Sequence, residues 1–200
     1  MDPVEREARR LLDRYLTEVV ERFGLCPWAA SARADLQIEI VRSPDEAAAA
    51  VARIAASSAP IGMVVLASSS ITPRELQALR DACMRDDVAI ADFHPRATGD
   101  DATPARLVPV LRRSPDPMLQ VVRWSVLHAA RRQPPAPDRA DQARILAGHA
   151  SDARVSVADQ IAQTNHATIT AHTLAALTEI LDDLTRDRDA AYASCTSPSP

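Results

Sequence analysis

The chain has 200 residues, of which 46% are hydrophobic and 25% charged, and its formal net charge is -4. This composition predicts a soluble globular protein with a sizeable core, and the negative charge disfavours nucleic acid as a partner. The sequence has no apolar run of about 18 residues, which disfavours a membrane partner, and its charged start without a signal-peptide core predicts a cytoplasmic location.

Several kinds of chemistry are excluded by residue types that are missing or rare. All 23 basic residues are arginine, which excludes Schiff-base catalysis and a phosphate loop that needs Gly-Lys. The four glycines form no Gly-x-Gly-x-x-Gly motif, so a Rossmann fingerprint is excluded. The three cysteines are widely spaced and argue against a disulfide framework. The histidines form no metal-ligand pair, so we expect no metal site made by protein groups alone.

A long helix and three short strands are expected in the first half of the chain. Apolar residues recur at helical spacing over residues 3–23, and Gly24 is placed to end this helix. Three short apolar runs between turn residues are typical of buried strands. These strands are expected at residues 36–41, 61–67 and 88–93.

Helices are expected between these strands. Ser43 and Thr72 are each followed three residues later by a glutamate, which is the capping-box signal for a helix start. Alternating strands and helices with short connections predict an α/β fold, with a small, three-stranded parallel sheet (βαβαβ) surrounded by helices. The carboxyl ends of parallel strands share one edge, where ligands bind, and His94 follows the third strand at that edge.

The second half of the chain is expected to be largely helical. Residues 95–117 are expected to form a long irregular segment, and a helix is expected over 117–132. The predicted organisation is an α/β core over 1–132, a proline-rich spacer over 133–138, a helical C-terminal part over 139–188 that packs on the core, and a disordered tail over 189–200.

Cys26 and His94 are the candidate catalytic residues. Pro27 predicts that Cys26 is the N-cap of a short helix, where the helix dipole lowers the pKa of a thiol and favours the nucleophilic thiolate. The imidazole of His94 can act as a general acid or base. Thiolate and imidazole also bind haem iron, so either residue could be an axial ligand. The structural alternatives are a buried cap for Cys26 and hydrogen bonds to loop carbonyls for His94.

Arg113, Ser114 and Arg123 lie around the expected start of the helix over 117–132. A guanidinium beside a helix start suits a carboxylate or phosphate, so these residues are expected to bind an anionic small-molecule substrate. Asn165 belongs to a polar stripe of the last expected helix, which could line the same pocket. Pairing of the arginines with surface acids is the structural alternative.

Three short motifs resemble those of a bacterial protein family. They are Leu25-Cys26-Pro27-Trp28-Ala29, Phe93-His94-Pro95 and Arg113-Ser114-Pro115-Asp116-Pro117-Met118-Leu119. With these motifs, in this order, the sequence over roughly residues 5–132 resembles the domain-of-unknown-function family numbered fourteen-fifteen. The resemblance supports Cys26, His94, Arg113 and Arg123 as site residues, and it names no reaction.

Three functions remain open from the sequence. The first is a small-molecule enzyme that uses Cys26 and His94 on an anionic substrate. The second is a haem-binding protein or haem enzyme with one of these two residues as axial ligand. The third is a non-catalytic accessory or binding subunit. The third is favoured by Asp116, Gln120 and Trp124, which stand where the family has tyrosine, histidine and glutamate.

Overall fold

One mixed sheet of four strands forms the centre of the molecule. The computed structural model describes residues 1–26, 29–127, 162–163, 165–167, 169 and 171–196. Its strands are β1 (Leu36–Val41), β2 (Ile61–Leu66), β3 (Val88–Phe93) and β4 (Met118–Arg123). They are arranged in the order β1-β2-β4-β3, with β1 parallel to β2 and with β4 antiparallel to both β2 and β3. The prediction of three strands in a parallel sheet was therefore wrong in strand number and in pairing.

Strand β4 is the element that the sequence analysis assigned to a helix. Its residues alternate between the two faces of the sheet, with Met118 packed among residues of one face and Leu119 among those of the other. Because both faces of β4 are largely covered, it lacks the apolar–polar alternation that distinguishes a strand from a helix. Strands β1, β2 and β3 nevertheless point in one direction, because β2 and β3 are both antiparallel to β4.

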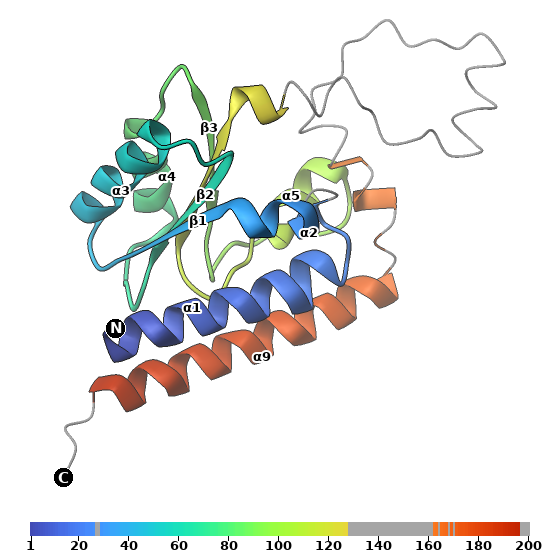
Figure 1. Cartoon of the computed structure of the whole chain (residues 1–200). Coiled ribbons are helices and arrows are strands. Elements are labelled where there is room, and N and C mark those ends of the chain that lie inside the picture. Colours follow the sequence, from blue (N-terminus) through green and yellow to red (C-terminus); the bar gives the residue numbers. More distant parts are fainter. Residues whose placement is uncertain (27–28, 128–161, 164, 168, 170, 197–200) are drawn as a thin grey trace, which may run out of the picture.

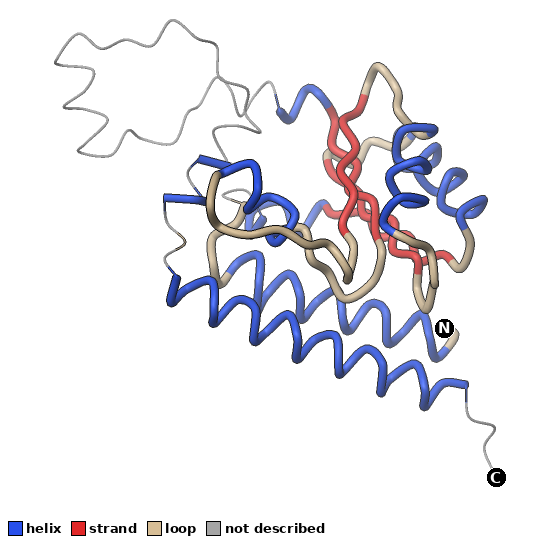
Figure 2. Tube along the Cα trace, turned by 180° about the vertical axis from the view of Figure 1, so that it is seen from behind, coloured by secondary structure: helices blue, strands red, loops and turns tan. Residues whose placement is uncertain are grey.

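Helices α3 (Pro44–Ala56) and α4 (Pro73–Ala82) cover one face of the sheet (Figures 1 and 2). Their predicted starts are confirmed: the Ser43 hydroxyl accepts from the backbone N–H of Glu46, and Thr72 forms a full capping box with Glu75. Leu66 and Leu119 are fully buried in this layer, and burying a leucine side chain contributes about 1.5–3 kcal/mol.

The other face of the sheet is covered by helices from the two ends of the chain. Helix α1 (Pro3–Tyr15) continues as the π-helical segment η1 (Leu16–Glu21), and Gly24 with a φ of +61° follows it. Helix α9 (Ala171–Thr196) lies beside α1 and runs in the opposite direction (Figures 1 and 2). Because α9 extends to Thr196, residues 189–196 are helical, which corrects the predicted disordered tail.

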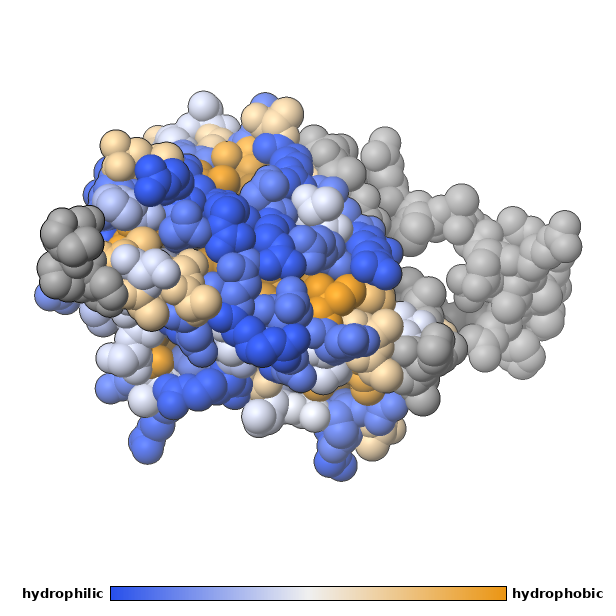
Figure 3. Space-filling view, turned by 90° about the horizontal axis from the view of Figure 1, so that it is seen from below, coloured by the Kyte–Doolittle hydropathy of each residue, from blue (hydrophilic) through white to orange (hydrophobic). Residues whose placement is uncertain are grey.

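An ion-pair network joins α1 to α9. Both terminal nitrogens of Arg10 donate to the carboxylate of Asp187 at 2.8 Å, and Arg14 binds the same carboxylate. These guanidinium groups lower the pKa of Asp187 to about 2. Exposed ion pairs such as these contribute at most about 1 kcal/mol each to stability. The face of the molecule seen from below is mainly hydrophilic (Figure 3).

Three further short helices lie between the larger elements. They are α2 (Ala29–Ala32), the 3-10 helix η2 (Arg33–Asp35) and α5 (Pro104–Leu111). Helix α5 lies within the segment predicted to be irregular, and it begins where the Thr103 hydroxyl accepts from the backbone N–H of Arg106 at 3.3 Å. The predicted spacer over 133–138 lies outside the described residues. No helix in the described ranges is long and apolar enough to cross a membrane.

Candidate functional site

A cavity of about 1200 Å³ lies on the sheet face opposite α3 and α4. Alternate residues of the strands form its floor, and residues of α1, η1, α2 and α5 contribute to its walls. The strand residues of its lining, which all follow this alternation except Ile90, are Leu36, Ile61, Met63, Ala89, Ile90, Ala91, Phe93, Met118, Gln120 and Val122. Ligand pockets are generally concave and mostly apolar with a few polar groups, and this cavity has that character.

The cavity brings together Cys26 and Asn165, two of the predicted site residues. Cys26 is half-buried in the wall, and its backbone carbonyl accepts from the N–H of Ala29 at 3.1 Å at the start of α2. Asn165 is buried, and its side-chain N–H donates to the carbonyl of Leu25 at 3.3 Å across 140 positions of sequence. The Asn165 side chain therefore holds the backbone next to Cys26 in place.

His94 is not among the residues that line this cavity. It is 4% exposed, its Nδ1 accepts from the backbone N–H of Arg96 at 2.9 Å, and its Nε2 lies 2.9 Å from the carbonyl oxygen of Ile71. This pattern fixes the neutral tautomer with the proton on Nε2. Burial lowers the pKa of His94, and the nearby Arg96 lowers it further. Proton transfer or iron binding at either nitrogen would first break one of these hydrogen bonds.

The predicted anion-binding residues also lie outside the residues that line the cavity. Arg113 pairs with Asp182 of α9 at 2.7 Å. Arg123 donates to the carbonyls of Ala55, at 2.9 Å, and Ala59, at 3.1 Å, so it caps the carboxyl end of α3. Ser114 donates its hydroxyl hydrogen to the carbonyl of Asp116 at 2.7 Å.

Two other arginines, Arg33 and Arg112, do line the cavity. Arg33 donates to Glu21 at 2.7 Å, so part of its charge is already neutralised. Arg112 lies 3.9 Å from Asp92, which is a long contact for an ion pair. An anionic group in the cavity would therefore find Arg112 as its most accessible cation.

A buried charged cluster at the carboxyl-end edge of the sheet was missed by sequence reasoning. Asp116 is 1% exposed and accepts from Arg188 Nε at 2.9 Å and from the Tyr192 hydroxyl at 2.5 Å. The guanidinium of Arg188 lies 5.2 Å from the centroid of the Tyr192 ring. Burial raises the pKa of Asp116, while its two partners oppose the rise. Arg188 was placed on the last helix without a role, and Tyr192 lay in the predicted tail, so no signal pointed to this cluster.

Asp116 is also one of the residues that the sequence analysis took to favour a non-catalytic subunit. In the fold its carboxylate anchors α9 to the strand edge through Arg188 and Tyr192. This buried acid therefore has a structural role.

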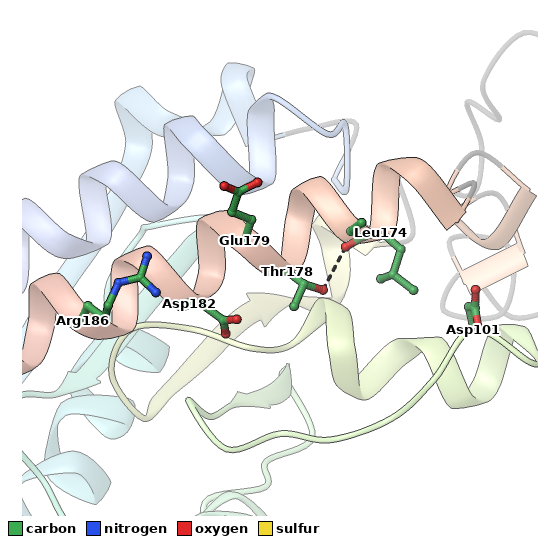
Figure 4. Close-up of a pocket in the computed structure, with 7 residues that line it drawn as sticks. Asp101, Leu174, Thr178, Glu179, Asp182 and Arg186 are labelled. Atoms are coloured by element: carbon green, nitrogen blue, oxygen red, sulfur yellow. Dashed lines mark hydrogen bonds between the residues drawn. The ribbon is translucent and has the colours of Figure 1, made fainter.

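A second hollow, of about 550 Å³, lies along α9 (Figure 4). It is lined by Asp101, Leu174, Ala175, Thr178, Glu179, Asp182 and Arg186. The three acidic side chains do not converge on one point (Figure 4), and the Thr178 hydroxyl is bonded to the carbonyl of Leu174 at 2.9 Å. No group of three or more metal-ligating side chains was found within the described ranges. The larger cavity is therefore the stronger candidate for a functional site.

Comparisons with known proteins do not identify a related protein or family. No family model matches the sequence, no curated protein matches it, and no solved structure matches the fold.

Proposed function

We propose that the protein is a small-molecule enzyme whose substrate occupies the cavity on the sheet face, with the thiol of Cys26 as the reacting group. The observation that carries the proposal is a large, mostly apolar cavity with this cysteine in its wall. Ligand sites commonly combine an apolar lining with a few polar groups that orient the ligand, and a thiolate is a strong nucleophile. Asn165 supports this wall by holding the carbonyl of Leu25.

In this proposal Arg112, and not Arg113 or Arg123, would bind an anionic group of the substrate. The first two arginines are committed to Asp182 and to the end of α3, whereas Arg112 lines the cavity. His94 keeps its predicted role only if the ring gives up the N–H of Arg96 or the carbonyl of Ile71. The proposal does not require that change, because Cys26 lines the cavity and His94 does not.

Haem in the same cavity is the second candidate function. The supporting observation is that three sulfur-containing residues line this cavity, namely Cys26, Met63 and Met118. Thiolate and thioether sulfur are both axial ligands of haem iron in proteins, and the apolar lining suits a porphyrin. Haem reconstitution should then give a Soret band that shifts in the Cys26→Ser variant.

Binding of the neutral fluorophore N-phenyl-1-naphthylamine tests whether the cavity accepts apolar molecules. Its fluorescence should rise when it binds the wild-type protein. The Ala91→Leu variant adds bulk to the cavity floor and should weaken binding at least tenfold. The matched control is Ala49→Leu, because Ala49 is exposed on α3, on the other side of the sheet. Equal binding by both variants would place the fluorophore elsewhere and contradict the proposal.

Alkylation by iodoacetamide tests the role of Cys26. Peptide mapping should show that saturating fluorophore slows alkylation of Cys26. Alkylation of Cys195, a half-buried thiol outside the lining, should be unchanged and provides an internal control. If the ligand protects neither thiol or both equally, Cys26 does not face the bound molecule. Once a substrate has been identified, Cys26→Ser should abolish turnover without changing the unfolding midpoint.

A further inference from the structure

Two polar groups of the cavity have no hydrogen-bond partner among the described residues. The first is the hydroxyl of Tyr15, the last residue of α1, whose side chain is 1% exposed and belongs to the cavity wall. The second is the carboxamide of Gln120, which lies on the floor in the central strand β4. The other amide in the wall, Asn165, bonds to the carbonyl of Leu25.

The surroundings of Gln120 are apolar. Its neighbours across the strands on the same face are Met63 of β2 and Ala91 of β3, and neither side chain accepts or donates a strong hydrogen bond. The Gln120 side chain is only half-buried, and no buried side-chain nitrogen or oxygen of the described residues lacks a hydrogen-bond partner, so its amide is open to the cavity. The amide is therefore available to a molecule bound there.

Tyr15 is the second polar residue of the cavity lining without a hydrogen-bond partner among the described residues. Burial alone raises the pKa of its hydroxyl, because no charged group or hydrogen bond contributes. Buried tyrosine hydroxyls usually find a partner, and phenylalanine would pack equally well against the neighbouring apolar residues. The cavity thus contains two neutral polar groups that can bond to a bound molecule.

We propose that the cavity selects a largely apolar molecule carrying one neutral carboxamide-like group, and that Gln120 and Tyr15 determine this specificity. The inference rests on the proposed ligand site in the cavity, and it replaces the anionic group at Arg112 by a neutral one. The Gln120 amide offers a donor and an acceptor side by side, which match the acceptor and donor of a ligand amide. The Tyr15 hydroxyl offers a further donor to the ligand. Neither residue carries a charge, so this part of the cavity favours a neutral group over a carboxylate.

Displacement of N-phenyl-1-naphthylamine by three ligands of nearly equal size tests the inference. The ligands are 2-naphthamide, which donates and accepts, 2-acetonaphthone, which only accepts, and 2-naphthoate, which is an anion. For the wild-type protein we expect 2-naphthamide to act at about tenfold lower concentration than either analogue, because a site built for two hydrogen bonds rejects a ligand that leaves one unmade.

The variants connect this preference to the two residues. In the Gln120→Leu variant the amide and the ketone should bind with about equal affinity, while the fluorophore still binds. In Tyr15→Phe affinity for the amide and the ketone should fall together by about threefold to tenfold, because both ligands present the oxygen that the hydroxyl would bind. The Ala49→Leu variant should keep the wild-type order of the three ligands.

Each result has a distinct meaning. Fluorophore binding without an amide preference in the wild-type protein would overturn the inference and leave the cavity as a ligand site. Tightest binding by 2-naphthoate would also overturn it and would support an anionic ligand at Arg112. Absence of fluorophore binding to the wild-type protein would overturn the proposed function and this inference with it.

Discussion

The hydroxyl of Tyr192 donates to the carboxylate of Asp116 at 2.5 Å, although 76 positions separate the two residues. Arg188 binds the second oxygen of the same carboxylate at 2.9 Å. One buried acid thus holds two successive turns of α9 against the segment that leads into β4. A buried ion pair of this kind depends on both partners, because removal of one leaves the other charge without compensation.

We predict that Arg188→Ala lowers the free energy of unfolding by about 3 kcal/mol, because Asp116 is then buried without its cation. Urea unfolding followed by far-ultraviolet circular dichroism would measure this loss. The matched control is Arg186→Ala on the same helix, since Arg186 is 68% exposed and pairs with the exposed Asp183. That change should cost less than about 0.5 kcal/mol. Equal losses in the two variants would show that the buried pair is not a major anchor of α9.

A change at Arg123 should affect stability and leave ligand binding intact. Arg123→Ala removes the donors to the carbonyls of Ala55 and Ala59 and should cost about 1–3 kcal/mol, measured by the same urea titration. Arg123→Lys should recover only part of this loss, because one ammonium group cannot reach all the carbonyls that a guanidinium does. If Arg123 instead bound a substrate anion, alanine would weaken ligand binding and leave unfolding unchanged.

The pKa of the His94 imidazole should lie below its ordinary value of 6.5. Burial disfavours the charged ring in the folded protein, so the stability that His94 contributes is complete above the unfolded pKa of about 6.5. It is lost as the pH falls through the lower pKa of the folded state. NMR titration of the ring should show this lower pKa and the Nε2–H tautomer, with a normal titration in urea. A folded-state pKa at or above 6.5 would contradict the assigned hydrogen bonds and would favour a role in acid–base catalysis.

Replacement of Gln120 should increase stability in the absence of ligand. Gln120→Leu replaces a half-buried amide in apolar surroundings by an apolar side chain and should raise the unfolding free energy by about 1 kcal/mol. For a chain of this length that corresponds to an increase in Tm of about 2–4 °C, measurable by scanning calorimetry. The same substitution at Gln77, which is exposed on α4, should leave Tm nearly unchanged. A loss of stability in Gln120→Leu would mean that the amide has a structural partner, and the specificity role would then fail.

Local signals in the sequence predicted much of the fold correctly. The starts of α3 and α4 were found because Ser43 and Thr72 satisfy the helix N-terminus within three residues of sequence. Strand β4 could not be found in this way, because Met118 and Leu119 are buried on opposite faces and their apolar run fits either a strand or a helix. Helix α5 was missed because its first residue, Pro104, and the internal Pro109 resemble a loop sequence.

The candidate site was less predictable than the fold. Cys26 was identified from its dipeptide with Pro27, and Asn165 from its helical stripe, and both lie at the cavity. The importance of Gln120 comes only from its position in β4, which the sequence analysis had assigned to a helix. Tyr15 looked like any apolar residue of an amphipathic helix, since burial of its hydroxyl depends on contacts with distant strands.

The pairing of α1 with α9 has a consequence for synthesis of the chain on the ribosome. Helix α1 is made before α9, yet its partner residue for Arg10 is Asp187, 177 positions later. The apolar residues of α1 that face α9 therefore remain uncovered until α9 has left the exit tunnel. Tyr15 and the cavity wall that it belongs to would take their final arrangement at that late moment. A ribosome-bound chain that stops before α9 should accordingly expose α1 to chaperones and to proteases.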